Sequence, residues 1–357
     1  MPNQEPMIKV QDVRFRYDPE QPKYAVDGVS LDIRRGEFVA VLGANGCGKS
    51  TLAKHFNAIL LPEAGTVLVE GMDTRNEDHL YDVRQKVGMV FQNPDDQIFR
   101  YNVLDEVMFG PLNIGMDEKT AREKSREALA MTGLAGLEDR NPYDLELYER
   151  KMVAIASVLA MDPDVLILDE PTSYLDIRHK LELLAILRKM AKENGITVIM
   201  SLHEIDLAQK ISDQVICVKG DRIAEFGDPE EIFTEATIRD LYEIDNGYYD
   251  PIFGSVELPK PEGEPEVLVL SSGKTGIPVY RKLQKAGIPF AAGILYPGES
   301  DYQLARLLAS GIISEEPYEP ISDETYQRTL EVMERCGKVI NAGVKVGSMN
   351  QKMGELL

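Results

Sequence analysis

A glycine-rich octapeptide is the strongest chemical feature of the sequence. Residues 43–50 read GANGCGKS and match the pattern G-x-x-x-x-G-K-[ST], between the buried run "EFVAVLG" and a segment with helical spacing. Such a loop can wrap its backbone N–H groups around phosphate oxygens, while Lys49 reaches the terminal phosphates and Ser50 can hold Mg²⁺. The predicted nucleotide-binding residues are Gly43, Ala44, Asn45, Gly46, Cys47, Gly48, Lys49, Ser50 and Thr51. Cys47 is interpreted as a tolerated loop residue in preference to a redox switch.

Two carboxylates follow a second apolar run. Residues 165–170 read VLILDE, which predicts a buried strand that delivers Asp169 and Glu170 at its carboxyl end, where ligands of open parallel sheets bind. Alone, this pattern is more often a strand that meets solvent. Beside a phosphate loop, Asp169 is expected to hold Mg²⁺ through its water shell. Glu170 is expected to orient or deprotonate the attacking water.

Three further side chains are candidates for the same site. His203 follows the apolar run "TVIMSL" and would lie at another strand end, near the γ-phosphate. Gln92 follows "VGMVF" and could reach both Mg²⁺ and the attacking water. Tyr17 could stack on adenine, since an aromatic face suits any base; the alternative is a core tyrosine.

The segment "DLELYERKMVAIA", residues 144–156, is predicted to open a helix just before VLILDE. Glu146 and Glu149 would lie in its first turn, where the helix dipole favours negative charge. This segment should therefore stabilise its own helix and repel a phosphate.

The elements that position these residues alternate along the chain. Residues 7–17 and 24–33 have apolar residues near every second place and are predicted to be strands. Strands are also predicted at "TVLVEG", "ITVIMSLHE" and "QVICVKGDRIAEFG", and residues 117–190 are mainly helical apart from VLILDE. A helix from 178 to 193 should end at Asn194-Gly195.

A second alternating pattern follows a change in composition. Residues 246–264 are rich in Pro, Gly and acidic residues and are predicted to be a linker between domains 1–245 and 265–357. Strands and helices then alternate from "EVLVLS" to "KVINAGV", which indicates a small parallel sheet with flanking helices. "SGKTG" is too short for a phosphate loop. Glu299 and Asp301 could bind a metal or small ligand, although solvated loop acids are favoured.

Bulk properties exclude several classes of function. The net charge of −21 argues against nonspecific binding of nucleic acid or anionic lipid. The three cysteines (Cys47, Cys217 and Cys336) have no metal-like spacing and are expected to be reduced thiols in a cytosolic protein. No signal peptide and no apolar run long enough to span a membrane are apparent, so we expect any membrane role to depend on a partner.

In this order the motifs resemble those of the ATP-binding-cassette (ABC) ATPases over about residues 7–245. The resemblance implies an α/β fold. Its P-loop nucleotide-binding domain would have a mixed sheet core, an antiparallel β subdomain and a helical subdomain, followed by a small Rossmann-like α/β domain. It implies ATP and Mg²⁺ as ligands. The matched motifs are the aromatic loop (Tyr17), Walker A (Gly43–Ser50), the Q-loop (Gln92), Walker B and the catalytic glutamate (Asp169, Glu170), the D-loop (Asp176) and the switch histidine (His203).

Within that family, "VGMVFQNPDDQIF" and "DEVMFGPLNIGM" resemble the ATPase subunits of energy-coupling factor transporters. These import vitamins or metal ions such as cobalt and nickel. The resemblance implies a second ATPase, either a different one or a second copy of this chain, with a transmembrane coupling subunit and a membrane substrate-capture subunit as further partners and no nucleic acid. It also implies a peripheral location on the cytoplasmic face of the membrane. Residues 265–357 resemble C-terminal extensions of some importer ATPases, and a regulatory ligand domain and a dimerising platform both remain open.

The chain departs from the family at the signature segment, Leu-Ser-Gly-Gly-Gln. Alignment places Leu145, Glu146, Leu147, Tyr148 and Glu149 on its five positions, at the expected interface with a second ATPase. Glu146 would face the partner's γ-phosphate, and one like-charge pair at about 4 Å costs on the order of 4 kcal/mol at an effective dielectric near 20. We therefore expect asymmetric pairing, with one competent ATP site. The alternative is that the segment swings away or that a cation bridges the charges.

Three functions follow from these patterns. The leading prediction is the ATP-hydrolysing motor of an energy-coupling factor importer. The alternatives are a nucleotide-gated regulatory subunit with little turnover and a soluble ABC ATPase that is not attached to a transporter.

Overall fold

The structure is a computed structural model that describes residues 5–357. Contacts between Cα atoms divide the chain into two compact units, which are described separately. The first unit contains the residues up to Glu243 together with Pro251–Gly254, and the second contains Ile244–Asp250 and Ser255–Leu357. Among the helices of the described residues, none is long and apolar enough to cross a membrane.

The first unit begins with an antiparallel sheet. Strands β1 (Ile8–Phe15), β2 (Val26–Ile33), β4 (Ala64–Val69) and β5 (Met72–Asp73) follow the order β2-β1-β4-β5. Alternation of apolar and polar residues leaves one face of β1 and β2 buried and the other exposed, as is usual for a half-covered antiparallel sheet. The strands predicted at 7–17 and 24–33 are confirmed.

A six-stranded sheet forms the centre of this unit. It contains β3 (Phe38–Leu42), β6 (Val87–Val90), β7 (Val165–Leu168), β8 (Thr197–Ser201), β9 (Gln214–Lys219) and β10 (Arg222–Gly227), in the order β10-β9-β3-β8-β7-β6. All neighbouring pairs are parallel except β9 and β10. Every residue of β3, β6, β7 and β8 is buried, which explains their continuous apolar runs. Their carboxyl ends share one edge, so this sheet brings the predicted site residues together.

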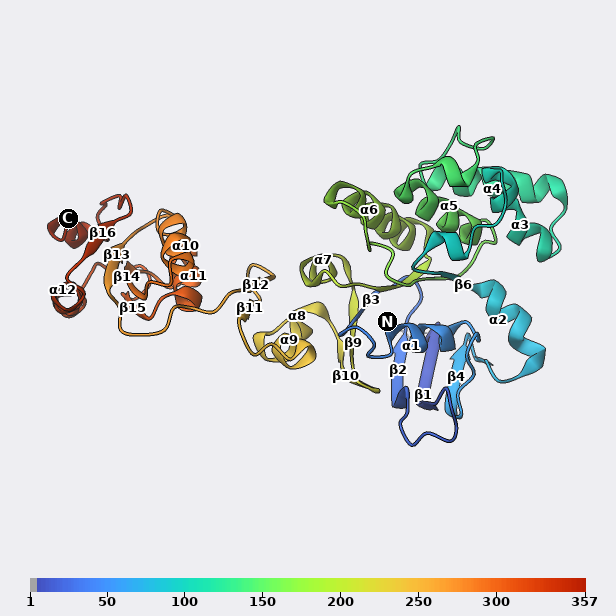
Figure 1. Cartoon of the computed structure of the whole chain (residues 1–357), viewed down its shortest axis with the longest axis horizontal. Coiled ribbons are helices and arrows are strands. Elements are labelled where there is room, and N and C mark those ends of the chain that lie inside the picture. Colours follow the sequence, from blue (N-terminus) through green and yellow to red (C-terminus); the bar gives the residue numbers. More distant parts are fainter. Residues whose placement is uncertain (1–4) are drawn as a thin grey trace. The chain divides into compact units, whose positions relative to one another are not determined.

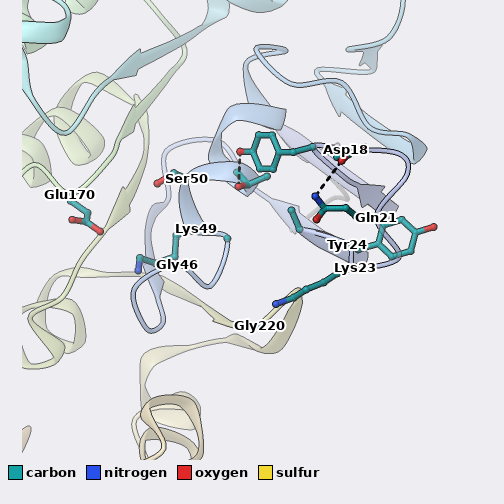
Figure 2. A pocket seen from close by; sticks show the side chains of 13 residues that line it. Asp18, Gln21, Lys23, Tyr24, Gly46, Lys49, Ser50, Glu170 and Gly220 are labelled. Carbon is teal, nitrogen blue, oxygen red and sulfur yellow. Dashed lines mark hydrogen bonds between the residues drawn. The ribbon is translucent and has the colours of Figure 1, made fainter.

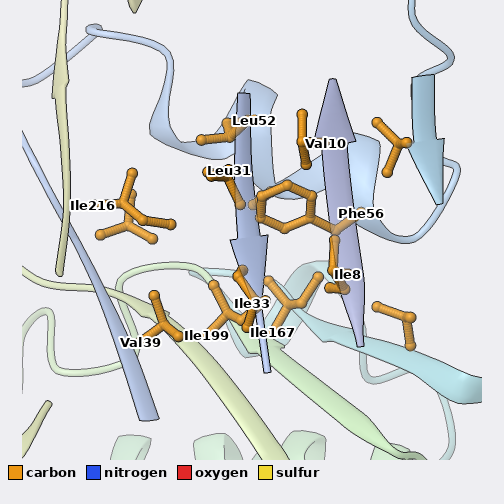
Figure 3. Close-up of a cluster of buried hydrophobic side chains, with 14 of the residues drawn as sticks. Ile8, Val10, Leu31, Ile33, Val39, Leu52, Phe56, Ile167, Ile199 and Ile216 are labelled. Carbon is orange, nitrogen blue, oxygen red and sulfur yellow. The ribbon is translucent and has the colours of Figure 1, made fainter. Parts of the chain in front are cut away.

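The hydrophobic core of the first unit lies between the two sheets and α1 (Lys49–Phe56). Figure 3 shows Ile8 and Val10 of the antiparallel sheet facing Leu52 and Phe56 of the helix, with Ile167 of the central sheet nearby. This packing holds α1, and therefore the phosphate loop before it, against the central strands.

Helices complete the first unit. Its helical subdomain consists of α3 (Val103–Asn113), α4 (Glu118–Met131) and α5 (Leu147–Leu159), which lie together in Figure 1. The other helices are α2 (Leu80–Lys86), α6 (Ile177–Asn194), α7 (Ile205–Ile211), α8 (Pro229–Ile232) and α9 (Glu235–Tyr242), with short 3₁₀ turns at Glu77–His79, Pro94–Asp96 and Pro142–Asp144. As predicted, α6 ends at Gly195, which adopts the left-handed conformation with φ 71°.

The second unit is a small doubly wound fold. Strands β13 (Val267–Leu270), β14 (Phe290–Leu295), β15 (Gly311–Ser314) and β16 (Val339–Asn341) form a parallel sheet in the order β15-β14-β13-β16. Helices α10 (Ile277–Lys285) and α11 (Ser300–Leu308) pack in one hydrophobic cluster, and α12 (Asp323–Cys336) with the 3₁₀ turn Gln351–Glu355 packs in another. The predicted fold class, an ABC-type domain followed by a Rossmann-like domain, is confirmed.

Residues 246–264, predicted as a linker, contain regular structure. Strands β11 (Tyr248–Asp250) and β12 (Ser255–Glu257) pair as an antiparallel ribbon. The side chain of Glu257 is buried and accepts a hydrogen bond from Arg281 Nη2 at 2.7 Å. The Pro- and Gly-rich composition concealed this ribbon because its strands are only three residues long.

Candidate functional site

The phosphate loop folds around its own lysine. Lys49 is the first residue of α1, is only 5% exposed, and donates hydrogen bonds from Nζ to the carbonyl oxygens of Gly43 at 2.9 Å and Ala44 at 3.1 Å. These contacts place the charged amine inside the curve of the loop. A phosphate oxygen that enters the loop would therefore meet both this amine and the N-terminus of α1.

Two glycines of the loop are required by close packing. A Cβ at Gly43 would lie 2.3 Å from the carbonyl oxygen of Val218 and 2.6 Å from Cys47 Sγ. A Cβ at Gly48 would lie 2.9 Å from the carbonyl oxygen of Ala25. Both residues also have positive φ angles, 149° and 99°, which side chains rarely tolerate. The loop can therefore adopt this shape only with glycine at both places.

Cys47 is buried beneath the loop, and burial raises the pKa of its thiol. The thiol is therefore kept protonated, which fits a packing residue better than a redox switch. By contrast, Ala44, Asn45 and Gly46 are exposed at the tip of the loop.

A pocket of about 420 Å³ opens beside the loop. Its walls include Tyr17, Lys49, Ser50, Thr51 and Glu170, so the structure brings these predicted residues into one cavity. The ring of Tyr17 is 64% exposed, and its hydroxyl lies 3.0 Å from Thr51 Oγ1. Tyr17 is thus a wall of the pocket and not a core residue.

The segment that follows Tyr17 supplies a second wall that the sequence reasoning missed. Asp18, Gln21, Lys23 and Tyr24 line the pocket opposite Lys49, Ser50 and Glu170 (Figure 2). The exposed ammonium group of Lys23 adds positive charge where an anionic ligand would enter. The sequence offered one indication of this second wall, because these residues follow directly after Tyr17, the predicted aromatic residue.

The two strand-end carboxylates are held by one serine. Ser201, the last residue of β8, donates from Oγ to Asp169 Oδ1 at 3.0 Å and accepts from the backbone N–H of Glu170 at 2.7 Å. Glu170 has a positive φ of 45°, which is strained for a residue with a side chain. The serine bridge and the strained backbone together set the direction of the Glu170 carboxylate.

Glu170 is the meeting point of the predicted catalytic residues. Gln92 donates from Nε2 to Glu170 Oε2 at 2.7 Å, and His203 Nε2 lies 2.7 Å from Glu170 Oε1. These side chains come from the ends of three neighbouring strands, β6, β7 and β8. The structure therefore places Gln92, Glu170 and His203 in direct contact beside the pocket.

A buried lysine behind this group was not predicted from the sequence. Lys151 on α5 is only 3% exposed and donates from Nζ to the carbonyl oxygen of Gln92 at 3.1 Å. Burial lowers its pKa to about 8, although the nearby charge of Glu170 raises it. The only sequence signal was a charged residue within the otherwise apolar face of the predicted helix. Lys151 ties the Q-loop to the helix that starts at the signature segment.

The signature segment forms a self-stabilised helix start, as expected. Glu146 is the N-cap of α5, and its backbone N–H donates to Glu149 Oε2 at 3.0 Å. The side chain of Glu146 is exposed. Leu145 is buried within its own unit at 7% exposure. Its apolar side chain packs inward because burial removes apolar surface from water.

Tyr148 is turned toward its own chain. Its ring stacks on His179 of α6 with centroids 4.4 Å apart and an interplanar angle of 19°. His179 in turn lies beside Asp176, the N-cap of α6, with Nδ1 and Oδ2 separated by 3.1 Å. The stack therefore links the signature helix to the D-loop residue Asp176.

The oxygen atoms at this edge of the sheet suit Mg²⁺. Ser50 offers a hydroxyl, Gln92 an amide oxygen and Asp169 a carboxylate, and hard oxygen donors of this kind are what Mg²⁺ prefers. No group of three or more His, Cys, Asp or Glu side chains that could hold a metal ion occurs in the part of the chain that the structure describes. Mg²⁺ is commonly bound through one or two carboxylates together with substrate phosphates and water.

Comparisons with known proteins agree with this geometry. Residues 26–173 match the ABC transporter family, and residues 290–357 match the MJ0874 family. The chain is 45% identical over 237 residues to the energy-coupling factor transporter ATP-binding protein EcfA1 of Symbiobacterium thermophilum, covering 65% of this chain and 82% of that protein.

Solved structures of ABC transporter ATPases are also similar to this chain. The cbiO1 protein from Clostridium perfringens, described as part of the ABC transporter complex cbiONQ, is 37% identical with a TM-score of 0.61, over 66% of this chain and 94% of that one. The ATP-binding cassette MJ0796, solved as a dimer in a post-hydrolysis state with ADP and Pi, is 28% identical with a TM-score of 0.57, over 62% of this chain and 99% of that one. The chain thus belongs to the ABC transporter ATPases, is similar to energy-coupling factor transporter ATP-binding proteins, and is an ATPase.

Proposed function

We propose that this chain is the ATP-driven motor of an energy-coupling factor importer for a metal ion such as cobalt or nickel, or for a vitamin. The observation that supports ATP hydrolysis at this site is the contact of Glu170 with Gln92 and His203 at the edge of the nucleotide pocket. The similarity to EcfA1 and cbiO1 supports the transporter assignment. The chain would work at the cytoplasmic face of the membrane, bound to membrane-embedded partners.

Each residue of the site has a role that follows from its place. Lys49 and the loop Gly43–Ser50 bind the phosphates, and Tyr17 presents an exposed aromatic face to the base. Ser50, Gln92 and Asp169 would hold Mg²⁺, which neutralises charge that develops on the phosphates. Glu170 orients and deprotonates the attacking water, and His203 stabilises the γ-phosphate group.

The assignment of Glu170 is tested by Glu170→Gln. The amide keeps the shape of the side chain but cannot accept a proton, so ATP turnover should fall by at least a factor of about 10² while nucleotide affinity is retained. Turnover is measured by phosphate release and affinity by titration with a fluorescent nucleotide. Glu193→Gln, at an exposed position on α6, is the matched control and should leave both values unchanged. Normal turnover in Glu170→Gln would remove Glu170 from the proposed mechanism.

An exposed aromatic patch supports a membrane partner near the Q-loop. We define the Q-loop aromatic patch as Phe99, Tyr101 and Tyr143, all of which are exposed. Phe99 packs edge-on against Phe109 with centroids 4.6 Å apart, and Tyr143 donates its hydroxyl to the carbonyl oxygen of Ile98 at 2.9 Å. These contacts hold the rings at the surface, where a helix of a transmembrane coupling subunit could bind.

The signature segment supports pairing with a different ATPase. Glu146 is exposed at the N-terminus of α5, the place at which a family member with serine meets the partner's phosphate. Its carboxylate would repel that phosphate. One competent site would then form from the phosphate loop and Glu170 of this chain and an intact signature in the second ATPase. The site that contains Glu146 would be weak or silent.

Turnover of the purified chain alone tests this pairing. We expect very low ATPase activity without a second ATPase, and a large increase when Glu146→Ser, Leu147→Gly, Tyr148→Gly and Glu149→Gln are combined. Because Tyr148 is stacked on its own α6, Glu146→Gln alone should recover most of that increase. Robust activity of the unaltered chain alone would refute asymmetric pairing. Low activity even with a competent partner would favour a nucleotide-gated regulatory subunit.

A further inference from the structure

The second unit contains a hollow that the ATPase function does not use. Its volume is about 670 Å³, and its walls come from the segments that follow β13, β14, β15 and β16. In the order β15-β14-β13-β16, the chain moves outward from β13 to β15 and then returns to the other side of β13. The hollow therefore lies at the carboxyl edge of the sheet next to its topological switch point, which is the usual ligand position in open α/β sheets.

A fold of this kind would bind phosphate at the start of α10, but a side chain of the protein already occupies that place. In the loop between β13 and α10, the backbone N–H of Lys274 donates to Asp301 Oδ2 at 2.9 Å. Asp301 is fully buried, so the expectation of a solvated loop acid is wrong for this residue. Burial raises the pKa of Asp301, and the N–H of Lys274 acts in the opposite direction. A carboxylate that already occupies the start of α10 argues against a nucleotide as the ligand of this unit.

The walls of the hollow are braced by hydrogen bonds between different loops. Ser272 Oγ accepts from the backbone N–H of Lys345 at 3.1 Å, and Tyr296 donates its hydroxyl to the carbonyl oxygen of Met349 at 3.0 Å. Asn350 donates to the carbonyl oxygen of Lys345 at 2.9 Å and accepts from the N–H of Gly347 at 2.6 Å. These polar groups are used to shape the site and hold it open.

Two charged groups in the wall remain without an ion-pair partner. Among the described residues, neither the carboxylate of Glu299 nor the amine of Lys345 makes an ion pair, and both line the hollow. Glu299 is half-buried, and burial followed by the charge of Asp301 raises its pKa. By contrast, the nearby Glu315 is already bonded to the backbone N–H and hydroxyl of Ser322. Glu299 and the solvent-exposed Lys345 are therefore the charges in this wall that are available to a ligand.

The remaining wall is aromatic and apolar. Tyr318 is 92% exposed, has a positive φ of 68°, and lines the hollow together with Tyr296, Val346 and Met349. The strained backbone at Tyr318 holds its ring in the solvent, where the ring offers a flat apolar face. Binding a ligand on this face would cost little side-chain entropy. The site thus combines a negative group, a positive group and flat apolar surfaces.

We propose that this hollow binds a small zwitterion, a molecule with one amine and one acid group on a flat or apolar body. Glu299 pairs with the amine, Lys345 pairs with the acid group, and Tyr318 with Tyr296 packs against the body. The second unit is then a sensor for an amino-acid-like ligand, and this role is independent of the ATP site.

Three related probes distinguish recognition of the amine from recognition of the acid group. L-tryptophan carries both charges, tryptamine lacks the acid group, and indole-3-propionate lacks the amine. Because the chain contains no tryptophan, the fluorescence anisotropy of each indole can be followed directly in the presence of the full-length protein. L-tryptophan should bind saturably, and each of the other two should bind at least tenfold more weakly.

Variants assign each contact. Glu299→Gln should make the affinities for L-tryptophan and indole-3-propionate equal. Lys345→Met should make the affinities for L-tryptophan and tryptamine equal. Tyr318→Ala should weaken the binding of all three probes. It should leave the melting temperature of the protein unchanged, since the side chain is almost fully exposed. Glu262→Gln and Lys282→Met, two exposed positions of the same unit, are the matched controls and should bind like the unaltered chain.

Several results would overturn the proposal. Absence of saturable binding for all three probes would exclude a zwitterion site. Equal affinity for tryptamine and L-tryptophan would show that no acid group is recognised. If Glu299→Gln reduced the affinity for all three probes by the same factor, this residue would shape the site without recognising the amine. Lys49→Ala, which removes the amine that binds ATP phosphates, should leave the binding of L-tryptophan unchanged.

Discussion

At the scale of single residues, the site depends on side chains that hold one another in place. Glu170 contacts Gln92 and His203, while Ser201 holds the backbone of Glu170 and the carboxylate of Asp169. The residue types and strand-end positions of Asp169, Glu170, His203 and Gln92 were recognisable from sequence. Lys151 was not, because a lysine on a predicted helix is normally solvated and only the packed structure shows its burial.

The burial of Lys151 predicts a pH-dependent contribution to stability. Its pKa of about 8 lies below the ordinary value of 10.5, so the unfolded chain binds more protons at this group between these values, and stability rises with pH there. The free energy of unfolding relative to Lys151→Met should increase by about 2 kcal/mol from about pH 7 to about pH 9.5.

Urea unfolding at the two pH values measures this difference. Lys189→Met, at an exposed position on α6, is the control and should show no such change. A difference between the unaltered chain and Lys151→Met that stays constant with pH would contradict the depressed pKa of this lysine.

At the scale of elements, α5 connects the signature segment to two other motifs. Lys151 bonds to the Q-loop at Gln92, and Tyr148 stacks on His179 of α6, beside the D-loop residue Asp176. The sequence correctly predicted α5 and its acidic N-terminus from the helical spacing and the two glutamates. The direction of Tyr148 could not be predicted, because a tyrosine in the first turn can point toward solvent, a partner or a neighbouring helix.

The contact of Tyr148 with His179 should couple α5 and α6 energetically. In a double-mutant cycle with Tyr148→Ala and His179→Ala, the coupling energy should be about 1 kcal/mol, as expected for a stacked ring pair. Tyr148→Phe should preserve the coupling, since the stack does not need the hydroxyl group.

The measurement is the free energy of unfolding of each variant in urea. A parallel cycle with Tyr101→Ala and His179→Ala serves as the control, because Tyr101 packs near Tyr143 and not on α6. Additive effects of Tyr148→Ala and His179→Ala would show that the stack contributes no stability.

At the scale of the whole molecule, the chain combines an ATPase with a separate α/β unit. The change of composition near residue 245 predicts two domains, and the alternating strand and helix patterns after it predict the second parallel sheet. The ribbon formed by β11 and β12 was missed because strands of three residues carry too little periodicity to stand out from a Pro- and Gly-rich segment.

The proposed role of the whole molecule in transport predicts a loss of partner binding when the Q-loop aromatic patch is changed. Phe99→Ser combined with Tyr101→Ser removes exposed apolar surface without changing the ATP pocket. Co-purification with the transmembrane coupling subunit from detergent-solubilised membranes should be lost, while nucleotide affinity is retained.

The control for this experiment is Tyr81→Ser, which alters an exposed tyrosine on α2, outside the patch. It should co-purify normally. Retention of the membrane subunit by the double variant would place the transporter interface elsewhere on the chain.

The sequence by itself determined the chemistry of the ATP site and the class of both units, because a phosphate loop, strand-end carboxylates and hydrophobic periodicity are local patterns. Only the tertiary structure decided the inward burial of Leu145 and Lys151, the stacking of Tyr148 and the position of Asp301 at the start of α10. These features depend on contacts between segments far apart in the chain. Local spacing contains no information about which neighbour a side chain will meet.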